Sequence, residues 1–345
     1  MSMMSMPTDE LPLVSICTPT FNRRPFITTL IKCMDSQTYP RDRMEWIIVD
    51  DGTDKIEDLV SNHPLVLYFK FDKKMSLGKK RNLMHKKTRG SIIVYMDDDD
   101  YYPPERVSHA VEMLIKHPFA LCAGSSEMYI YFKDTNQMVQ FGPYGPNHAT
   151  AGTFAFRREM INDHHYNNDA CLAEEREFLK GYTVPFIQLD SMKTILVFSH
   201  RHNTFDKRVL LKDPFSNVMR LSEKTVQDFI QDESVVDFFM NLETTLIHYP
   251  LGEPEMKPDV LKETNAMIKK REEAKRMAYE KQFEKKKWYE KVALKSPEIF
   301  ERIESQEKTI FELQTEINKL KEQNRQLKDL YSKALRENVE LKKRI

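Results

Sequence analysis

The first 205 residues alternate short apolar runs with amphipathic stretches. Runs rich in β-branched and aromatic residues predict buried strands, and they cover residues 14–17, 46–49, 66–71 and 91–96. The amphipathic stretches at residues 25–37 and 79–87 predict helices. A strand–helix–strand order repeated in this way predicts a mostly parallel sheet with right-handed crossovers. The fold class expected from the pattern is therefore α/β.

The pattern changes in the rest of the chain. Residues 128–132 and 138–141 predict a hairpin, and residues 153–156 predict a further strand. After about Lys212 we expect no more strands, because residues 217–246 have a helical pattern. Three prolines between Tyr249 and Pro258 indicate a linker.

The C-terminal third is rich in charge and carries a heptad repeat. Residues 260–291 consist mainly of Lys, Glu, Arg and Met, which predicts a long solvated helix. Position a of the following heptads is taken by Ile303, Ile310, Ile317, Asn324, Tyr331, Asn338 and Ile345, and position d by Leu313, Leu320, Leu327, Ala334 and Leu341. Ile at a with Leu at d favours a parallel two-stranded coiled coil, and Asn at a fixes its register. The chain is therefore expected to form a homodimer; the alternative is a single amphipathic helix packed on the globular part.

These patterns predict three parts, at residues 1–212, 213–298 and 299–345. The counts of Lys plus Arg and of Asp plus Glu are both 53, so net charge gives no argument for binding nucleic acid or a membrane. The four cysteines are scattered without a CxxC spacing, which is typical of a reducing compartment. No signal peptide and no apolar stretch of membrane-spanning length are visible. A cytoplasmic location is the expectation.

Four consecutive aspartates, Asp97, Asp98, Asp99 and Asp100, follow the apolar run that ends at Met96 and precede Tyr101-Tyr102-Pro103-Pro104. They are therefore expected at the C-terminal end of a strand, where ligands bind in open α/β sheets. Packing carboxylates together costs several kcal/mol unless a cation joins them. This favours a metal site over the alternative, a solvated acidic turn.

Two further strands are followed by polar groups. Thr18-Pro19-Thr20-Phe21-Asn22-Arg23 comes after the first strand, and Asp50-Asp51-Gly52 comes after the second. Each motif alone is weak, because acidic turns after strands often only cap the next helix. Together with the aspartate run, they predict one polar site at one edge of the sheet.

In these motifs the sequence resembles the inverting glycosyltransferases of family 2, which have the GT-A fold. The matching pieces are residues 14–23, Gln37-Thr38-Tyr39-Pro40, residues 46–52, 78–82 and 95–104. The resemblance covers about the first 205 residues. It implies a GT-A catalytic domain at residues 1–212, followed by a helical extension and the coiled coil.

The resemblance also implies roles for individual residues. Thr18 and Pro19 would line the base and ribose of a nucleotide-sugar, and Asp51 would accept a hydrogen bond from the base, with Asp50 beside it. Arg81 would contact the donor, and Lys79 is a weaker candidate. Asp97 and Asp99 match the two acids of the Asp-x-Asp motif around Asp98, which would lie at the donor. Carboxylate oxygens in this number suit Mn²⁺ or Mg²⁺, with Asp99 as the direct ligand.

The remaining roles fall later in the chain. The family's catalytic base is the acid of a Glu-Asp pair at a helix start, and the matching residues here are Glu174 and Glu175. Glu175 takes the position of the usual Asp, and Glu174 remains the alternative. His202, with His200 as the alternate, would lie at the metal or diphosphate. His148 would lie on the acceptor side.

The expected function is thus a metal-dependent inverting transfer of a sugar from a nucleotide-sugar, a UDP-sugar, to an acceptor hydroxyl. The acceptor is a glycan, a lipid or a protein; nothing in the sequence selects one. Two alternatives remain. A nucleotidyltransferase also binds nucleotide and metal on an α/β sheet, but it normally has a Gly-rich loop that residues 18–24 lack. An inactive transferase-like scaffold would use the coiled coil to position partners.

Overall fold

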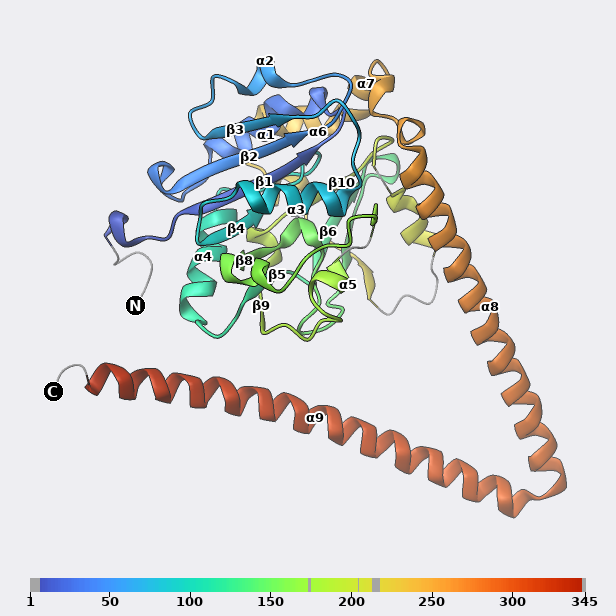
Figure 1. Ribbon diagram of the computed structural model, residues 1–345. Coiled ribbons are helices and arrows are strands. Elements are labelled where there is room, and N and C mark those ends of the chain that lie inside the picture. The colour runs from blue at the N-terminus through green and yellow to red at the C-terminus, as the bar shows by residue number, and fades with distance from the viewer. Residues whose placement is uncertain (1–6, 173–174, 204, 213–217, 343–345) are drawn as a thin grey trace. The chain divides into compact units, whose positions relative to one another are not determined.

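The structure is a computed structural model that describes residues 7–172, 175–203, 205–212 and 218–342 (Figure 1). The chain divides into two compact units, Met1–Ala266 and Met267–Ile345. The predicted division at residues 212 and 298 stays a prediction.

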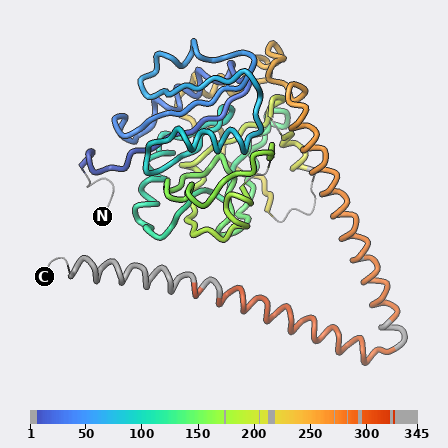
Figure 2. The backbone as a smooth tube through the Cα atoms, in the orientation of Figure 1, coloured from blue at the N-terminus to red at the C-terminus, as the bar shows by residue number. Residues whose placement is uncertain are grey.

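A seven-stranded sheet lies at the centre of the described part of the first unit, in the order β3-β2-β1-β4-β8-β5-β9 (Figure 1). Figure 2 shows the course of the backbone in the same orientation. The first four strands run parallel to one another and are β3 (Val66–Lys70), β2 (Met44–Asp50), β1 (Val14–Thr20) and β4 (Ile92–Tyr95). β8 (Ala155–Arg157) is antiparallel to both of its neighbours, β4 and β5 (Cys122–Gly124). β9 (Phe186–Gln188) then pairs with β5 in parallel. The predicted fold class, α/β with a mostly parallel sheet, is confirmed.

Both faces of this sheet are covered, so every residue of β1 and β2 is buried. Along β2, Trp46 and Ile48 belong to one core and Ile47 and Val49 to the other. The first core includes side chains from α1 (Arg24–Asp35), α4 (Arg106–Lys116) and α6 (Glu233–Met240). The second includes side chains from α3 (Leu77–Lys87) and α5 (Glu175–Phe178). Two short helices, α2 (Glu57–Val60) and α7 (Leu242–Leu246), complete the α-helices of this unit before α8.

A second, four-stranded sheet has the order β10-β6-β7-β11. β6 (Met128–Phe132) and β7 (Gln137–Phe141) form the predicted hairpin. β10 (Leu196–Ser199) pairs with β6 in parallel. β11 (Met219–Leu221) pairs with β7, so the expectation of no strand after Lys212 is wrong.

The regions expected to be helix and linker are also different in detail. Between residues 218 and 232 the structure has β11 and a single 3-10 turn, and the α-helix begins only at Glu233. Asp232 caps that helix by accepting hydrogen bonds from the amides of Ser234 and Val235. The proline-rich stretch at residues 249–258 consists of two 3-10 turns packed on the first unit, so it is not a free linker.

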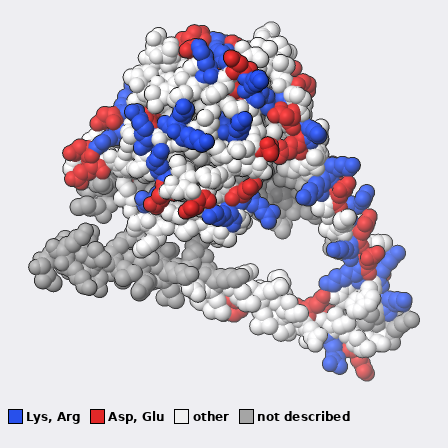
Figure 3. Space-filling view, in the orientation of Figure 1, with Lys and Arg blue, Asp and Glu red and all other residues white. Residues whose placement is uncertain are grey.

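Two long helices follow. α8 (Pro258–Lys295) begins in the first unit, and α9 (Pro297–Lys342) lies in the second. Lys, Arg, Asp and Glu are interspersed along α8 (Figure 3), as expected for a solvated helix. Several heptad side chains of α9 are exposed in the single chain, among them Ile310, Leu313 and Ile317. Across the described residues, no helix is both long and apolar enough to cross a membrane.

Candidate functional site

A cavity of about 400 Å³ lies where the predicted motifs meet. β1 lies between β2 and β4, so the residues that follow these three parallel strands share one edge of the sheet. The cavity is lined from that edge by Pro19 to Phe21, Arg23 and all four aspartates. The start of α3, Glu175, and residues of the second sheet complete its walls. Two of the three predicted strand-end motifs therefore line one cavity, whereas Asp50, Asp51 and Gly52 are not among the residues that line it.

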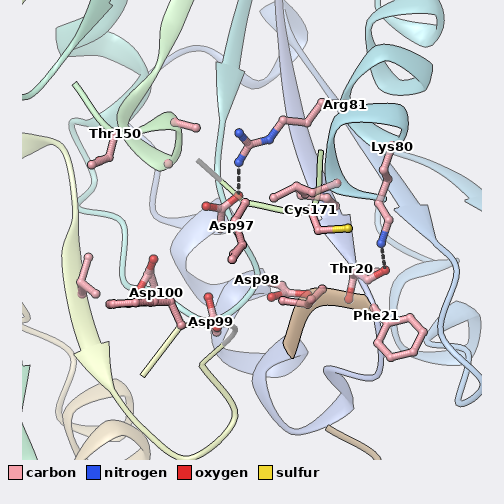
Figure 4. A pocket seen from close by; sticks show the side chains of 18 of the residues that line it. Thr20, Phe21, Lys80, Arg81, Asp97, Asp98, Asp99, Asp100, Thr150 and Cys171 are labelled. Atoms are coloured by element: carbon pink, nitrogen blue, oxygen red, sulfur yellow. Dashed lines mark hydrogen bonds and ion pairs between the residues drawn. The ribbon is translucent and has the colours of Figure 1, made fainter. Parts of the chain in front are cut away.

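The aspartate run turns sharply after β4 because the tyrosines that follow it are tied down. The amide of Asp97 donates to the Tyr102 hydroxyl at 2.6 Å, and Tyr101 exchanges backbone hydrogen bonds with Leu196 of β10. These contacts hold the four carboxyl groups at the floor of the cavity (Figure 4).

Arg23 is the main counter-charge of this run. Its side chain is 3% exposed, and its guanidinium lies 3.4 Å from Asp98 and 3.2 Å from Asp99. It also donates to the carbonyl oxygens of His202, at 2.7 Å, and Gly252, at 3.3 Å. Arginine suits this position because its five donors can serve several acceptors at once.

Burial and neighbouring charges shift the pKa values of three of the aspartates in different directions. Burial raises the pKa of Asp98 to about 7, although Arg23 opposes the shift. Burial also opposes ionisation of Asp99, but Arg23 and His200 outweigh it and hold the pKa of Asp99 well below its usual range. Burial and the neighbouring Asp99 charge raise the pKa of Asp100 well above its usual range. Of Asp98, Asp99 and Asp100, Asp99 is therefore the one whose pKa is held low and whose charge is favoured.

The carboxylates fit a divalent cation in chemistry but do not form a complete cage. Among the described residues, no group of three or more His, Cys, Asp or Glu side chains is placed to hold an ion. Mg²⁺ and similar ions are usually bound by one or two carboxylates together with substrate phosphates and water, so a full protein cage is not required. The buried Oδ1 of Asp100 has no hydrogen-bond partner in the described part of the chain, which leaves acceptor capacity at this floor.

Two cations of α3 point into the site (Figure 4). Arg81 lies 3.7 Å from Asp97, and its guanidinium stacks 4.9 Å above the ring of Tyr95. Lys80 donates to the Thr20 carbonyl at 2.9 Å and forms an ion pair with Asp51.

Asp51 is fully buried and already has protein partners. One carboxylate oxygen pairs with Lys80, and the other accepts the amide of Met75 at 2.5 Å. Its predicted contact with a nucleotide base stays a prediction, and base binding there requires sharing one of these oxygens.

Asp50, Thr18 and Pro19 take different positions. Asp50 caps its own turn, accepting from the amides of Gly52 and Ile56 and from the Tyr68 hydroxyl. Thr18 donates to the Met96 carbonyl at 2.7 Å and accepts from Trp46, so its hydroxyl is used within the sheet. Of the three, only Pro19 lines the cavity.

Glu175 lines the cavity at the first residue of α5. Its Oε1 accepts the amide of Ala151 at 3.3 Å, which orients the carboxylate beside residues 150–152. The alternative base, Glu174, lies outside the described residues. His148, the residue predicted on the acceptor side, has its ring between Tyr144 and Tyr182, about 5 Å from each.

The two histidines after β10 have separate surroundings. The Nε2 of His200 lies 3.5 Å from Asp99 and also contacts Asn203. The ring of His202 is buried beside Gly252, with Tyr249 at 6.3 Å. Burial lowers the pKa of His200 to about 4 and that of His202 to about 3, so both are neutral at pH 7. The structure thus places the alternate, His200, at the aspartates; the predicted metal contact of His202 stays a prediction.

Three cations of the site were not assigned from the sequence. In the sequence, Arg23 is only the last residue of the motif after β1, and Lys80 lies between the two predicted donor contacts, Lys79 and Arg81. Lys257 is buried, lines the cavity and comes from the stretch expected to be a linker. Burial lowers the pKa of Lys257 to about 7, partly balanced by Asp98 and Asp99. The sequence around Lys257 does not indicate that this residue lies at the site, because prolines on both sides of it are also typical of a linker.

Several known proteins are similar to parts of this chain. Residues 15–177 match the model of glycosyl transferase family 2. The poly(ribitol-phosphate) beta-N-acetylglucosaminyltransferase TarS of Staphylococcus aureus is 29% identical over 108 residues, which are 30% of this chain and 19% of TarS. The putative colanic acid biosynthesis glycosyl transferase WcaA of Escherichia coli is 33% identical over 116 residues, 31% of this chain and 41% of WcaA. A crystal structure of S. aureus TarS 1-349 superposes with a TM-score of 0.44 at 21% identity, covering 54% of this chain and 60% of that one.

The fold and the strand-end site define an α/β protein with a polar cavity at the carboxyl ends of its parallel strands. Residues 15–177, a little under half of the chain, are thus similar to glycosyl transferase family 2. The matched part spans about a fifth of TarS and about two fifths of WcaA.

Proposed function

We propose that this protein is a metal-dependent, inverting glycosyltransferase that uses a nucleotide-sugar, specifically a UDP-sugar, as donor. The observation that carries the proposal is the single cavity in which the aspartate run, Glu175 and the cations Arg81 and Lys80 meet. Similarity to the family supports the reaction class, and the names of the relatives agree with it.

The donor half of the cavity is built from charged groups. Asp97 and Asp99 would hold Mn²⁺ or Mg²⁺, with Asp98 at the donor beside them. Pro19 would line the base and ribose, next to Asp51. Arg81 would place its guanidinium on the diphosphate side of the cavity. The guanidinium would then have to bind the diphosphate as well as Asp97, which it contacts in this structure. When bound, the metal neutralises the charge that develops on the leaving nucleoside diphosphate.

Glu175 would act as the base. Its carboxylate takes the proton of the acceptor hydroxyl as that oxygen forms a bond to the anomeric carbon. The bond from the anomeric carbon to the phosphate oxygen breaks on the opposite side, and the nucleoside diphosphate leaves with the electron pair. The configuration is therefore inverted. The Ala151 amide supports this role, because it fixes one carboxylate oxygen and so the direction of the other.

Donor hydrolysis by the purified full chain tests the proposal. A panel of nucleotide-sugars is screened by thermal shift, since a ligand that binds only the folded state stabilises it. The donor that binds is then incubated with Mn²⁺ or with excess EDTA. Release of nucleoside diphosphate with Mn²⁺ alone is expected; release in EDTA would contradict metal dependence. Formation of a nucleoside triphosphate and a sugar 1-phosphate after pyrophosphate is added would point to a nucleotidyltransferase, and inertness toward every donor would point to a scaffold.

The exposed heptad side chains of α9 support a second proposal, a parallel homodimer through residues 299–345. Ile310, Leu313, Ile317 and Leu320 are each about half exposed in the single chain. A parallel partner helix would cover them as the a and d positions of a coiled coil. The acceptor class, the cytoplasmic location and the absence of nucleic-acid partners stay predictions.

A further inference from the structure

The segment from Tyr249 to Val260 (the 249–260 segment) is fixed on the strand-end site by contacts with distant parts of the chain. Its Tyr249 hydroxyl donates to Asp54 at 2.7 Å. The side chains of Asn22 and Arg23, in the motif after β1, donate to the carbonyl oxygens of Leu251 and Gly252 at 2.9 and 3.3 Å. The segment therefore belongs to the site, although it begins more than 70 residues after the part that matches the family.

The far end of the segment is fixed as well. Asp259, in the first turn of α8, pairs with Lys74, which also lines the cavity. One turn later Glu263 accepts the amide of Cys171 at 2.9 Å. Val260 is 7% exposed and lines the cavity. Lys257 lies between these two anchored ends of the segment, so the contacts on both sides hold it in place.

Three ammonium groups surround one aromatic ring of the cavity. Lys74, Lys80 and Lys257 have their nitrogen atoms 5.6, 6.0 and 5.8 Å from the centroid of Phe21. Two of them have a carboxylate partner: Lys74 pairs with Asp259 and Lys80 pairs with Asp51.

Lys257 differs from the other two. Its side chain is 6% exposed and lines the cavity, and within the described residues its ammonium makes no hydrogen bond and no ion pair within 4 Å. Asp98 and Asp99 act on it electrostatically, but Arg23 already contacts both of those carboxyl groups. The Lys257 side chain is mostly buried but lines the cavity, so an anion bound there could give its ammonium the acceptor that the described residues do not supply.

Building on the proposed function, we propose that Lys257 is a donor-binding residue whose ammonium contacts a diphosphate oxygen of the nucleotide-sugar, so that the 249–260 segment forms one wall of the donor site. Phosphate oxygens are the fitting partner, because an ammonium binds them as a compact point charge with three donors. The competing role for Lys257 is purely internal, as a counter-charge to Asp98 and Asp99.

Titration calorimetry on the full-length protein separates the two roles. The wild type, Lys257→Met and Lys257→Arg are titrated with UDP and with uridine, in EDTA and again with Mn²⁺. Lys262→Met is the matched control, because Lys262 is exposed on α8 only five residues further on. Circular dichroism checks that each variant is folded.

If Lys257 contacts the diphosphate, Lys257→Met weakens UDP about 10- to 100-fold, the usual worth of a hydrogen bond to a charged group. Uridine binding stays unchanged, Lys257→Arg recovers part of the affinity for UDP, and Lys262→Met behaves as wild type. Unchanged UDP affinity in Lys257→Met overturns the inference, and so does an equal loss for UDP and uridine. Failure of the wild type to bind UDP overturns the UDP-sugar proposal and the inference together, which distinguishes that result from a failure of the inference alone.

Discussion

The ion pair between Lys80 and Asp51 offers a quantitative test of the site's architecture. The side chain of Asp51 is fully buried and that of Lys80 is 6% exposed. Burial lowers the pKa of Lys80 while Asp51 opposes the shift, so each charge depends on the other. Removing one partner of a buried pair leaves an uncompensated charge and typically costs about 3–5 kcal/mol. We therefore expect Lys80→Met to lower the free energy of unfolding of the first unit by about this amount.

A double-mutant cycle separates the pair from its surroundings. In Lys80→Met with Asp51→Asn, both charges are gone and an amide oxygen still accepts from Met75, so most of the loss should return. The Thr20 carbonyl then loses the hydrogen bond from Lys80 and keeps the longer one from the Asp51 amide, at 3.4 Å, at a cost of about 1 kcal/mol. The double variant should thus be more stable than Lys80→Met alone.

Urea unfolding followed by fluorescence and by circular dichroism measures the cycle. Lys70→Met is the control, because Lys70 pairs with Glu57 on the surface, where both side chains are about half exposed. Such pairs contribute about 0.2–1 kcal/mol. The reasoning is wrong if Lys80→Met lowers the free energy of unfolding no more than Lys70→Met does. It is also wrong if the loss in the double variant equals the sum of the losses in Lys80→Met and in Asp51→Asn, because the two buried charges are then not coupled.

Three further predictions use other parts of the molecule. Glu175→Gln should reduce sugar transfer by about 10²–10⁴-fold with UDP affinity unchanged, and Glu174→Gln should act mildly; exchanged phenotypes would make Glu174 the base. Truncation after Pro297 should give a monomer by light scattering that still hydrolyses donor, whereas a dimeric truncation would exclude the coil as the main interface. Burial lowers the pKa of His85 to about 3 from 6.5, so its stabilising effect is complete above pH 6.5 and decreases as pH falls. The unfolding free energy of wild type relative to His85→Gln should then drop by about 2 kcal/mol between pH 7 and 5, and parallel curves would contradict it.

The aspartate run shows what local sequence can predict. An apolar run followed by acids and prolines defines a strand end without knowledge of the rest of the chain, and β4 confirms it. The same reasoning placed the turn after β1 and the acids after β2 at the same edge, because neighbouring parallel strands end together.

The partners of these groups could not be predicted in the same way. Asp50 and Asp51 are adjacent and alike in sequence, yet one caps a turn and the other pairs with Lys80, which depends on where α3 packs. Arg23 contacts Asp99 across 76 positions of the chain. Lys257 enters the cavity from a proline-rich stretch whose composition is typical of a linker. Such contacts follow from tertiary packing, which periodicity and turn signals do not encode.

The close approach of Gly252 to His202 provides a marker for this arrangement in other chains. A β-carbon at position 252 would lie 2.5 Å from Nδ1 of the buried His202 ring and 3.1 Å from the carbonyl oxygen of Asn22. A residue other than glycine would therefore require the His202 ring or the 249–260 segment to shift. A chain with a larger residue at this position would have to place that ring or this part of the backbone differently.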